Sequence, residues 1–218
     1  MLHCFCDFDG TITVRDTTDA VLEQFADPKY LEWEQKWEAG EISARECMAQ
    51  QVRLIRATPE AVRAFVREIP VDPGIHALVQ SCRLLGGTFT IVSDGIDFLM
   101  EEILRVHRLD SLPHYANHLR WEQPMQQVLT FPHGKDDCRG GCGLCKCAQM
   151  DQHAGAEGAE RWTVYVGDGL SDRCVVHEAD QVFAKGKLHT YCSEKGIIHT
   201  EFESLSEVAA ALAQTARV

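Results

Sequence analysis

The sequence is short of positive charge. Lysine and arginine together number 21 against 33 aspartates and glutamates, which gives a formal net charge of −12 at pH 7. Nucleic acids and anionic membranes both present negative charge, so a net acidic surface is repelled by them. We therefore expect no nucleic-acid partner and no membrane partner, although a small anion can still bind in a locally positive pocket.

The sequence also lacks a long apolar run and an export leader. No stretch approaches the ~20 apolar residues that a membrane-spanning helix needs. The first residues run straight into an apolar segment, without a charged region and a cleavage site. These absences predict a cytoplasmic protein. Its ten cysteines are then expected to be reduced thiols or metal ligands, not the disulfide framework of a small secreted protein.

The first informative feature of the sequence is an apolar run at residues 2–6. It is followed by Asp7 and Asp9, which lead into a Gly-Thr turn. The run is typical of a buried parallel strand, and acids spaced i, i+2 beyond its carboxyl end project to the same side. Open α/β sheets bind ligands at that edge. A divalent cation and a phosphate would complement the acids, with Asp7 as a nucleophile and Asp9 as a proton carrier. An ordinary Asx-rich turn is the alternative.

A long helical segment follows this turn. Asp16 or Thr17 can cap its first helix. Thr58 and Pro59 supply a cap and a proline at the first helical position of its last helix. No strand pattern interrupts the segment before residues 70–74, which break the helix. The sequence therefore predicts a helical insertion here.

Beyond the insertion, helices and strands alternate. The predicted elements are helices at 75–85, 97–107 and from Ser206 onward, strands at 88–92, 162–166 and 181–184, and a hairpin within 115–131. This alternation predicts an α/β fold with a parallel sheet and right-handed crossovers. With 218 residues, the chain can form one domain that carries a smaller inserted one.

Polar residues recur where the predicted strands end. Ser93 follows the second strand, and Asp168 and Asp172 follow the third. In a parallel sheet these ends gather at one edge, beside the acids of the opening turn. Phosphoryl transfer needs a nucleophile, a cation, hydrogen-bond donors and a proton donor. Lys146 would place a positive charge next to the phosphate, and the sequence then offers every group that this reaction needs.

These segments resemble the four signature motifs of the haloacid dehalogenase superfamily of aspartate-nucleophile phosphatases. Residues 7–11 match the first motif, Val92-Ser93 the second, Lys146 the third and residues 167–172 the fourth. The resemblance implies a Rossmann-like three-layer core with a parallel sheet, formed by residues 1–14 and 74–218, and a helical cap inserted at 15–73. It also implies a magnesium-dependent reaction through an aspartyl-phosphate.

The resemblance further implies a role for each matching residue. Asp7 attacks phosphorus, and Asp9 first protonates the leaving oxygen and then activates water. The groups expected to hold magnesium are Asp7, Asp168 and the backbone carbonyl of Asp9, supported by Asp172. The groups expected to contact the substrate are Lys146, Thr11, Ser93, and Asp94 and Gly95 through their amides.

The helical insertion resembles the cap of the phosphoserine-phosphatase-like branch, which excludes water and selects the substrate. Gln51 stands where that branch places an arginine for the substrate carboxylate. A phosphorylated amino acid is therefore disfavoured, unless a neighbouring arginine substitutes: Arg45, Arg53 or Arg56. Asp16 matches an acidic position used by the branch, with helix capping as its alternative role.

A closer resemblance, to the methionine-salvage phosphatase subfamily, lies around the third motif. It rests on residues 92–98 and on Pro132-His133 followed by a cysteine-rich loop that leads into Lys146. His133 is expected to reach the site, and an exposed loop histidine is the alternative. The loop contains four cysteines with spacing typical of a structural zinc site: Cys138, Cys142, Cys145 and Cys147. Plain reduced thiols and a disulfide are the alternatives.

Together these features predict a cytoplasmic, magnesium-dependent phosphatase of a small phosphorylated metabolite, monomeric or homodimeric. A methionine-salvage phosphoester is one candidate substrate and phosphoserine is another. A phosphotransferase that passes the aspartyl-phosphate to an alcohol is an alternative, because it shares the four motifs. An alternative of another class is a non-catalytic module that docks through the cysteine loop.

Overall fold

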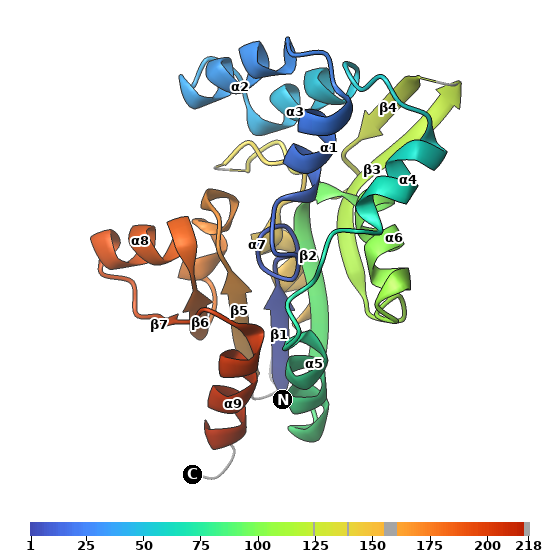
Figure 1. Ribbon diagram of the computed structural model, residues 1–218. Helices are drawn as coiled ribbons and strands as arrows, with labels where there is room; N and C mark the ends of the chain where they lie inside the picture. The colour runs from blue at the N-terminus through green and yellow to red at the C-terminus, as the bar shows by residue number, and fades with distance from the viewer. Residues whose placement is uncertain (124, 139, 155–160, 216–218) are drawn as a thin grey trace.

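The computed structural model describes residues 1–123, 125–138, 140–154 and 161–215 (Figure 1). Its strands are β1 (Leu2–Cys6), β2 (Thr88–Ile96), β3 (His114–Gln123), β4 (Gln126–Thr130), β5 (Trp162–Gly167), β6 (Gln181–Ala184) and β7 (Thr200–Glu201). They form a seven-stranded sheet in the order β4-β3-β2-β1-β5-β6-β7. The neighbours pair in parallel except for β4, which returns antiparallel to β3. The fold is α/β and Rossmann-like, as predicted.

The helices are α1 (Thr17–Phe25), α2 (Tyr30–Glu38), α3 (Ala44–Val52), α4 (Pro59–Val66), α5 (Ile75–Leu84), α6 (Asp97–Val106), α7 (Lys146–His153), α8 (Gly186–Lys195) and α9 (Leu205–Thr215). Three of the first four begin at a side-chain cap. Asp16, Ser43 and Thr58 each accept a hydrogen bond from an amide three residues on. These caps satisfy amides that have no partner inside the helix.

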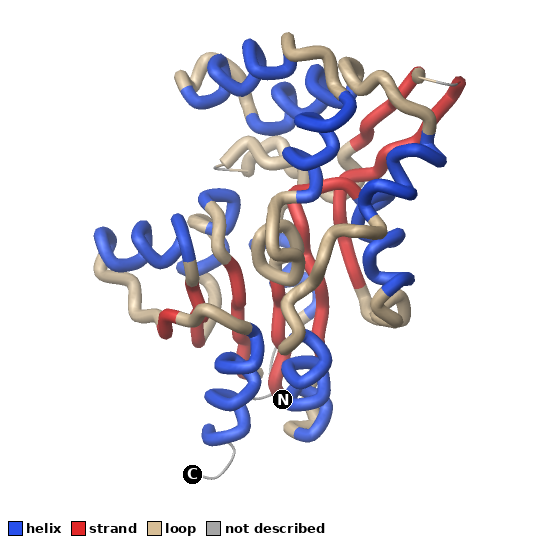
Figure 2. The backbone as a smooth tube through the Cα atoms, in the orientation of Figure 1, coloured by secondary structure: helices blue, strands red, loops and turns tan. Residues whose placement is uncertain are grey.

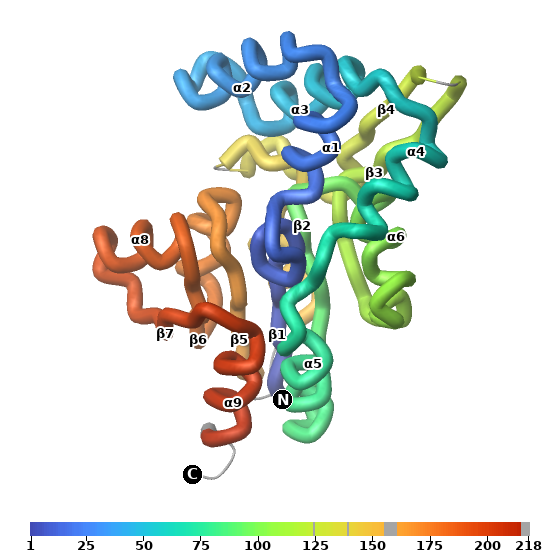
Figure 3. Tube along the Cα trace, in the orientation of Figure 1, coloured from blue at the N-terminus to red at the C-terminus, as the bar shows by residue number. Residues whose placement is uncertain are grey.

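Strand β1 occupies the middle of the sheet, between β2 and β5 (Figure 3). All five of its residues are buried. Cys4 and Cys6 lie in the core cluster that includes residues of α5 and α9, whereas Phe5 lies in the cluster that includes residues of α7 and α8. Because side chains alternate along a strand, β1 is apolar on both faces, and helices cover the sheet on both sides.

Helices α1–α4 are inserted between β1 and α5. The backbone view shows α1, α2 and α3 gathered beyond the end of β1, at the top of the molecule (Figure 2). The two connecting segments run side by side: the Val14 amide donates to the Pro70 carbonyl at 3.2 Å and the Asp72 amide to the Ile12 carbonyl at 2.8 Å. The two covalent connections of the insertion therefore form one paired stalk.

Helix α4 differs from the other inserted helices because it lies along α6 (Figure 1). Arg63 of α4 and Arg67, the residue directly after this helix, donate to the carboxylate of Glu102 on α6. Glu102 also binds Arg105 and is 1% exposed. Burial raises the pKa of Glu102, but the hydrogen bonds and charges of the arginines outweigh it and leave the pKa below its usual value. The base of the insertion is thus anchored on α6.

Helix α8 and the two-residue strand β7 were not predicted from the sequence. Helix α8 starts without a side-chain cap and buries only Leu188 and Cys192, so its apolar pattern is too sparse to indicate a helix.

Among the described residues, no helix has the length and apolar character needed to cross a membrane.

Candidate active site

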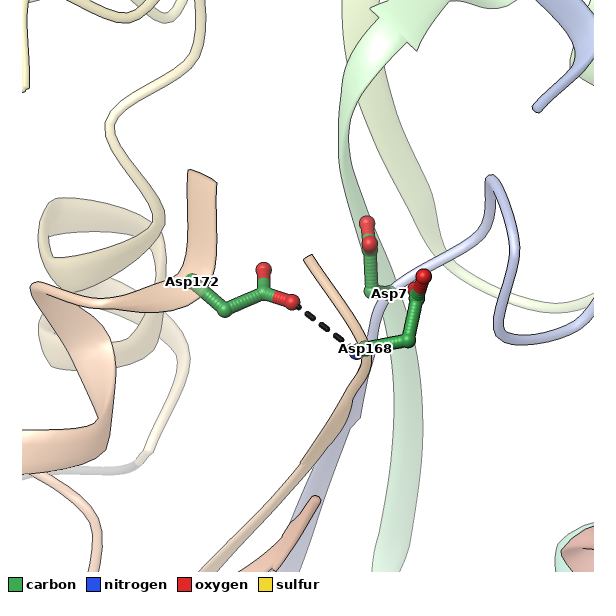
Figure 4. Close-up of side chains that lie close together, drawn as sticks. All are labelled: Asp7, Asp168 and Asp172. Carbon is green, nitrogen blue, oxygen red and sulfur yellow. Dashed lines mark hydrogen bonds between the residues drawn. The ribbon is translucent and has the colours of Figure 1, made fainter. Parts of the chain in front are cut away.

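Three carboxylates meet at the carboxyl end of the sheet. Asp7 follows β1, Asp168 follows β5, and Asp172 belongs to the short 3-10 turn Leu170–Asp172. Each offers an oxygen that lies within 4.8 Å of the other two. The close-up shows Asp7 and Asp168 pointing to the same side, while Asp172 approaches from the neighbouring turn (Figure 4). The parallel pairing of β1 and β5 brings these residues together.

Lys146 supplies the positive charge among these acids. It is the first residue of α7, and its Nζ donates to Asp7 Oδ1 at 2.7 Å and to Asp172 Oδ1 at 2.5 Å. Its side chain is 3% exposed. Burial lowers the pKa of Lys146, but the two carboxylates outweigh burial and hold the pKa above its usual value. Lys146 is therefore a fixed cation.

The carboxyl group of Asp7 is in an environment that opposes its ionisation. Burial and the nearby Asp172 raise its pKa well above the usual value, against the effect of Lys146. One ammonium group thus faces three carboxylates. A hard divalent cation prefers oxygen ligands of this kind and would supply the missing positive charge. The donor set and its charge fit magnesium.

Asp172 is held from several directions. Its carboxylate accepts hydrogen bonds from the Tyr165 hydroxyl at 2.6 Å and from the amides of Asp168 and Gly169 at 3.2 and 3.1 Å. It is fully buried. These donors orient Asp172 beside Lys146. Sequence reasoning missed Tyr165. The available signal was a tyrosine in the middle of a buried strand, because a buried phenol hydroxyl needs a hydrogen-bond partner.

Asp9 faces the inserted helices. Its Oδ1 accepts hydrogen bonds from the amide and the hydroxyl of Thr17, at 2.8 and 2.5 Å, and its Oδ2 accepts one from Ser93 Oγ at 3.2 Å. Burial raises the pKa of Asp9, and the bonds from Thr17 and Ser93 partly offset that rise. The first residue of α1 therefore touches this carboxyl group. The sequence indicated Thr17 only as a helix cap.

Two residues of the opening turn fit around Asp168. The Thr11 hydroxyl donates to Asp168 Oδ1 at 2.6 Å. In this structure the hydroxyl is therefore engaged with a carboxylate of the site and does not face space for a substrate. Gly10 has φ +75°, and a Cβ there would lie 2.5 Å from Asp168 Oδ2. Gly10 is therefore required both by its left-handed backbone and by the close approach of Asp168.

The end of β2 adds Ser93, Asp94 and Gly95. The Gly95 amide donates to Ser93 Oγ at 2.9 Å, and this hydroxyl in turn reaches Asp9. The Asp94 side chain accepts from the Leu144 amide at 2.9 Å. Ser93 is thus brought to the acidic group, whereas the Asp94 side chain is engaged with the cysteine-rich loop.

Other predicted residues lie outside this group. Asp16 caps α1 by accepting from the Asp19 amide at 2.9 Å. Gln51 is buried within the insertion, where its Nε2 donates to Glu34 Oε2 at 2.8 Å. His133 packs edge-on against Tyr115 and lines a groove of about 540 Å³ together with residues of the loop and of α7. The structure brings neither Gln51 nor His133 to the carboxylates, whereas Asp16 lies near Asp9: desolvation and the charge of Asp9 raise the pKa of Asp16 well above its usual value.

Arg45, an alternative cap arginine, is also engaged elsewhere. Its Nη2 donates to the carbonyls of Lys135 and Cys142 at 3.1 and 3.2 Å. Its amide donates to the Gly141 carbonyl at 3.2 Å. Arg45 therefore fastens the start of α3 to the cysteine-rich loop.

The structure does not support the zinc site. Within the described ranges, the group of metal-ligand atoms that lie within 4.8 Å of one another is the aspartate group, and the loop cysteines form no such group. Cys145 precedes α7 and Cys147 lies in its first turn, on either side of Lys146. All ten cysteines are free thiols, which favours the plain reduced thiols that the sequence left as an alternative.

The fold and the site define a class: a Rossmann-like α/β protein with a lysine-compensated acidic site at the carboxyl end of its parallel sheet. The chain belongs to the haloacid dehalogenase-like hydrolase family, whose model matches residues 4–177. The chain is 31% identical over 218 residues to a 2-hydroxy-3-keto-5-methylthiopentenyl-1-phosphate phosphatase of Bacillus mycoides (strain KBAB4), covering 97% of this chain and 95% of the relative.

A protein with the same description from Brevibacillus brevis (strain 47) is also 31% identical, over 98% of this chain and 96% of that one. Among solved structures, a phospho-aspartyl intermediate analogue of phosphoserine phosphatase matches with a TM-score of 0.70 at 20% identity, covering 96% of this chain and 97% of the other. A substrate-bound phosphoserine phosphatase complex gives a TM-score of 0.71 at the same identity and coverage. At this identity the structural likeness concerns the fold.

Proposed function

We propose that the protein is a magnesium-dependent phosphatase that hydrolyses a small phosphorylated metabolite through a phosphorylated Asp7. The observation that carries the proposal is the bond from Lys146 to Asp7 at 2.7 Å, inside a group of three carboxylates. A buried carboxylate next to a fixed cation and a metal-binding set suits attack on phosphorus.

The chemical steps follow from the positions of two acids. An oxygen of Asp7 attacks phosphorus and the bond to the leaving oxygen breaks, while Asp9 gives that oxygen a proton. Asp9 then takes a proton from water, whose oxygen attacks phosphorus and releases phosphate from Asp7. The raised pKa of Asp9 suits a group that must carry a proton and then accept one. Ser93 and Thr17 hold it in place.

A magnesium ion would be held by Asp7, Asp168 and the carbonyl of Asp9, with Asp172 behind them. When bound, it would neutralise negative charge on the phosphoryl oxygens. Residues 15–73 would form the cap, and the paired stalk would be its hinge. Gln51 and His133 are candidates for substrate contact only if the cap or the loop moves, whereas Asp16 already lies near Asp9.

Two relatives at 31% identity over nearly the whole chain are named as 2-hydroxy-3-keto-5-methylthiopentenyl-1-phosphate phosphatases, which makes that compound the first substrate to test. Phosphoserine is the second. Parent protein incubated with each compound and no added alcohol is expected to release inorganic phosphate and the dephosphorylated product in equal amounts. Product that forms only when an acceptor alcohol is added would identify a phosphotransferase instead.

Replacement of Asp9 is expected to separate substrates by leaving group. Asp9→Asn should lower kcat for an alkyl phosphate by about 10²-fold or more, because the alkoxide then leaves unprotonated. With p-nitrophenyl phosphate the leaving group needs no acid, so a rapid burst of one nitrophenolate per enzyme should precede slow turnover. Stopped-flow absorbance measures the burst. Equal losses on both substrates with no burst would rule out the proposed role.

Chelation of divalent cations is expected to stop turnover, and added magnesium should restore it. Asp168→Asn removes one anionic ligand, so the magnesium concentration for half-maximal activity should rise by about 10-fold or more. Asp151→Asn, an exposed acid on α7, serves as the matched control and should keep the parent value. Full activity of chelated parent protein, verified free of metal by elemental analysis, would contradict the magnesium assignment.

A further inference from the structure

The side chain of Asp94 joins two segments that are far apart in the sequence. Asp94 lies between Ser93 and Gly95 near the end of β2, and its Oδ1 accepts a hydrogen bond from the amide of Leu144 at 2.9 Å. Leu144 belongs to the cysteine-rich loop and is two residues before Lys146. The bond therefore connects the strand that carries Ser93 to the segment that carries the site's cation.

Asp94 is itself fixed by Asn117 of β3. The Asn117 side-chain amide donates to the Asp94 carbonyl at 2.6 Å and to its Oδ1 at 3.3 Å. Asn117 is fully buried. Sequence reasoning gave no role to this residue. A buried amide that bonds both the backbone and the side chain of one residue leaves that residue little freedom.

The cysteine-rich loop packs directly on this pair. A Cβ added at Gly143 would lie 2.5 Å from Asn117 Oδ1 and 2.6 Å from a ring carbon of Phe131. The neighbouring Leu144 side chain is completely buried, in the core cluster that also contains Val92 and Met150. The loop therefore has one close-fitting position at the point where Asp94 binds it.

The position of the loop decides where Lys146 can reach. Lys146 starts α7 directly after Leu144 and Cys145, and its Nζ must meet both Asp7 and Asp172. We propose that Asp94, held by Asn117, is a positioning residue that sets the cysteine-rich loop so that Lys146 contacts Asp7. This inference rests on the proposed function of Asp7 and Lys146. It concerns the side chain of Asp94 and is separate from the expectation that the backbone amide of Asp94 contacts the substrate.

The contacts of Asp94 explain why an acid can stand there. Burial raises its pKa, and the bond from the Leu144 amide, the charge of Lys146 and the bond from Asn117 act in the opposite direction. What the Leu144 amide requires is an acceptor oxygen, which a carboxamide also offers. Two substitutions at position 94 can therefore separate the effect of the negative charge from the effect of the hydrogen-bond acceptor.

The test compares Asp94→Asn with Asp94→Ala. Asp94→Asn keeps the acceptor and should stay within about 3-fold of the parent kcat for p-nitrophenyl phosphate. Asp94→Ala removes it and should lower kcat by about 10²-fold, with KM little changed, because displacement of a reacting group by about 1 Å is enough for a loss of that size. If Asp94 binds substrate through its charge or transfers a proton, the two variants should be impaired alike. That outcome, or an Asp94→Ala protein with parent kcat, would overturn the inference.

A second measurement does not depend on activity. Hydrogen exchange of the Leu144 amide should be slow in the parent and in Asp94→Asn and much faster in Asp94→Ala, at unchanged exchange of the central strand β1. Unchanged protection of the Leu144 amide in Asp94→Ala would contradict the positioning role, even if activity fell. If the parent protein hydrolysed no phosphate ester while the exchange pattern held, the proposed function would fail and the structural link would stand.

Discussion

Asp7→Asn is expected to lower phosphatase activity by at least about 10³-fold, because a carboxamide cannot take the place of the attacking carboxylate. The substitution keeps the size of the side chain and an oxygen that can accept from Lys146. It also removes a negative charge from a group whose ionisation is opposed by burial and by Asp172. The variant should therefore fold at least as stably as the parent.

The measurement is kcat/KM together with the thermal midpoint of unfolding. Asp110→Asn is the matched control, because Asp110 is an exposed acid away from the site, and it should keep parent activity. A non-catalytic docking module would lose nothing on Asp7→Asn. If the variant hydrolysed p-nitrophenyl phosphate as fast as the parent, Asp7 would not be the nucleophile.

Lys146→Met is expected to damage both turnover and stability. Its ammonium group is shared by Asp7 and Asp172, and all three side chains are buried. Removal of one partner of such a buried ion pair destabilises a protein by about 3–5 kcal/mol, since the remaining charges stay uncompensated. Turnover should fall by about 10²-fold or more, because the cation no longer faces the phosphoryl group.

Urea unfolding with a chelator present measures the stability term without metal. Lys195→Met, at an exposed position in the last turn of α8, is the control and should shift the free energy of unfolding by less than about 0.5 kcal/mol. A Lys146→Met protein as stable as this control would show that the buried carboxylates are not held by Lys146.

The strands were the most predictable part of the fold. Residues 2–6, 162–166 and 181–184 form strands close to where their mostly apolar runs predicted them, because a strand covered on both faces is apolar at most positions. Helix α8 escaped prediction because its buried face consists of two residues. Packing of the surrounding chain, not its own pattern, holds it in place.

The candidate site was predictable to the extent that it depends on strand ends. Asp7, Asp168 and Lys146 converge because the parallel strands end, and helix α7 begins, at one edge of the sheet. The residues that orient them were not predictable in this way. Tyr165 and Asn117 act through contacts made only after folding, and their spacing from the acids in the sequence carries no sign of it.

The expectation for the cap changed most. Gln51 is turned into the insertion, onto Glu34, and Arg45 is bound to carbonyls of the cysteine-rich loop. The loop is thus held from β2 by Asp94 and from α3 by Arg45. The loop that precedes Lys146 therefore contacts both the central sheet and the inserted helices.

Trapping of the phosphorylated enzyme tests the assignment of Asp7 most directly. Asp9→Asn protein, mixed with p-nitrophenyl phosphate and magnesium, is quenched in acid, digested and sequenced by mass spectrometry. We expect a phosphoryl group on Asp7 and on no other residue, with its amount equal to the nitrophenolate burst. A burst with the phosphoryl group on a different side chain, or product released with no covalent adduct at any time point, would contradict Asp7 as the nucleophile.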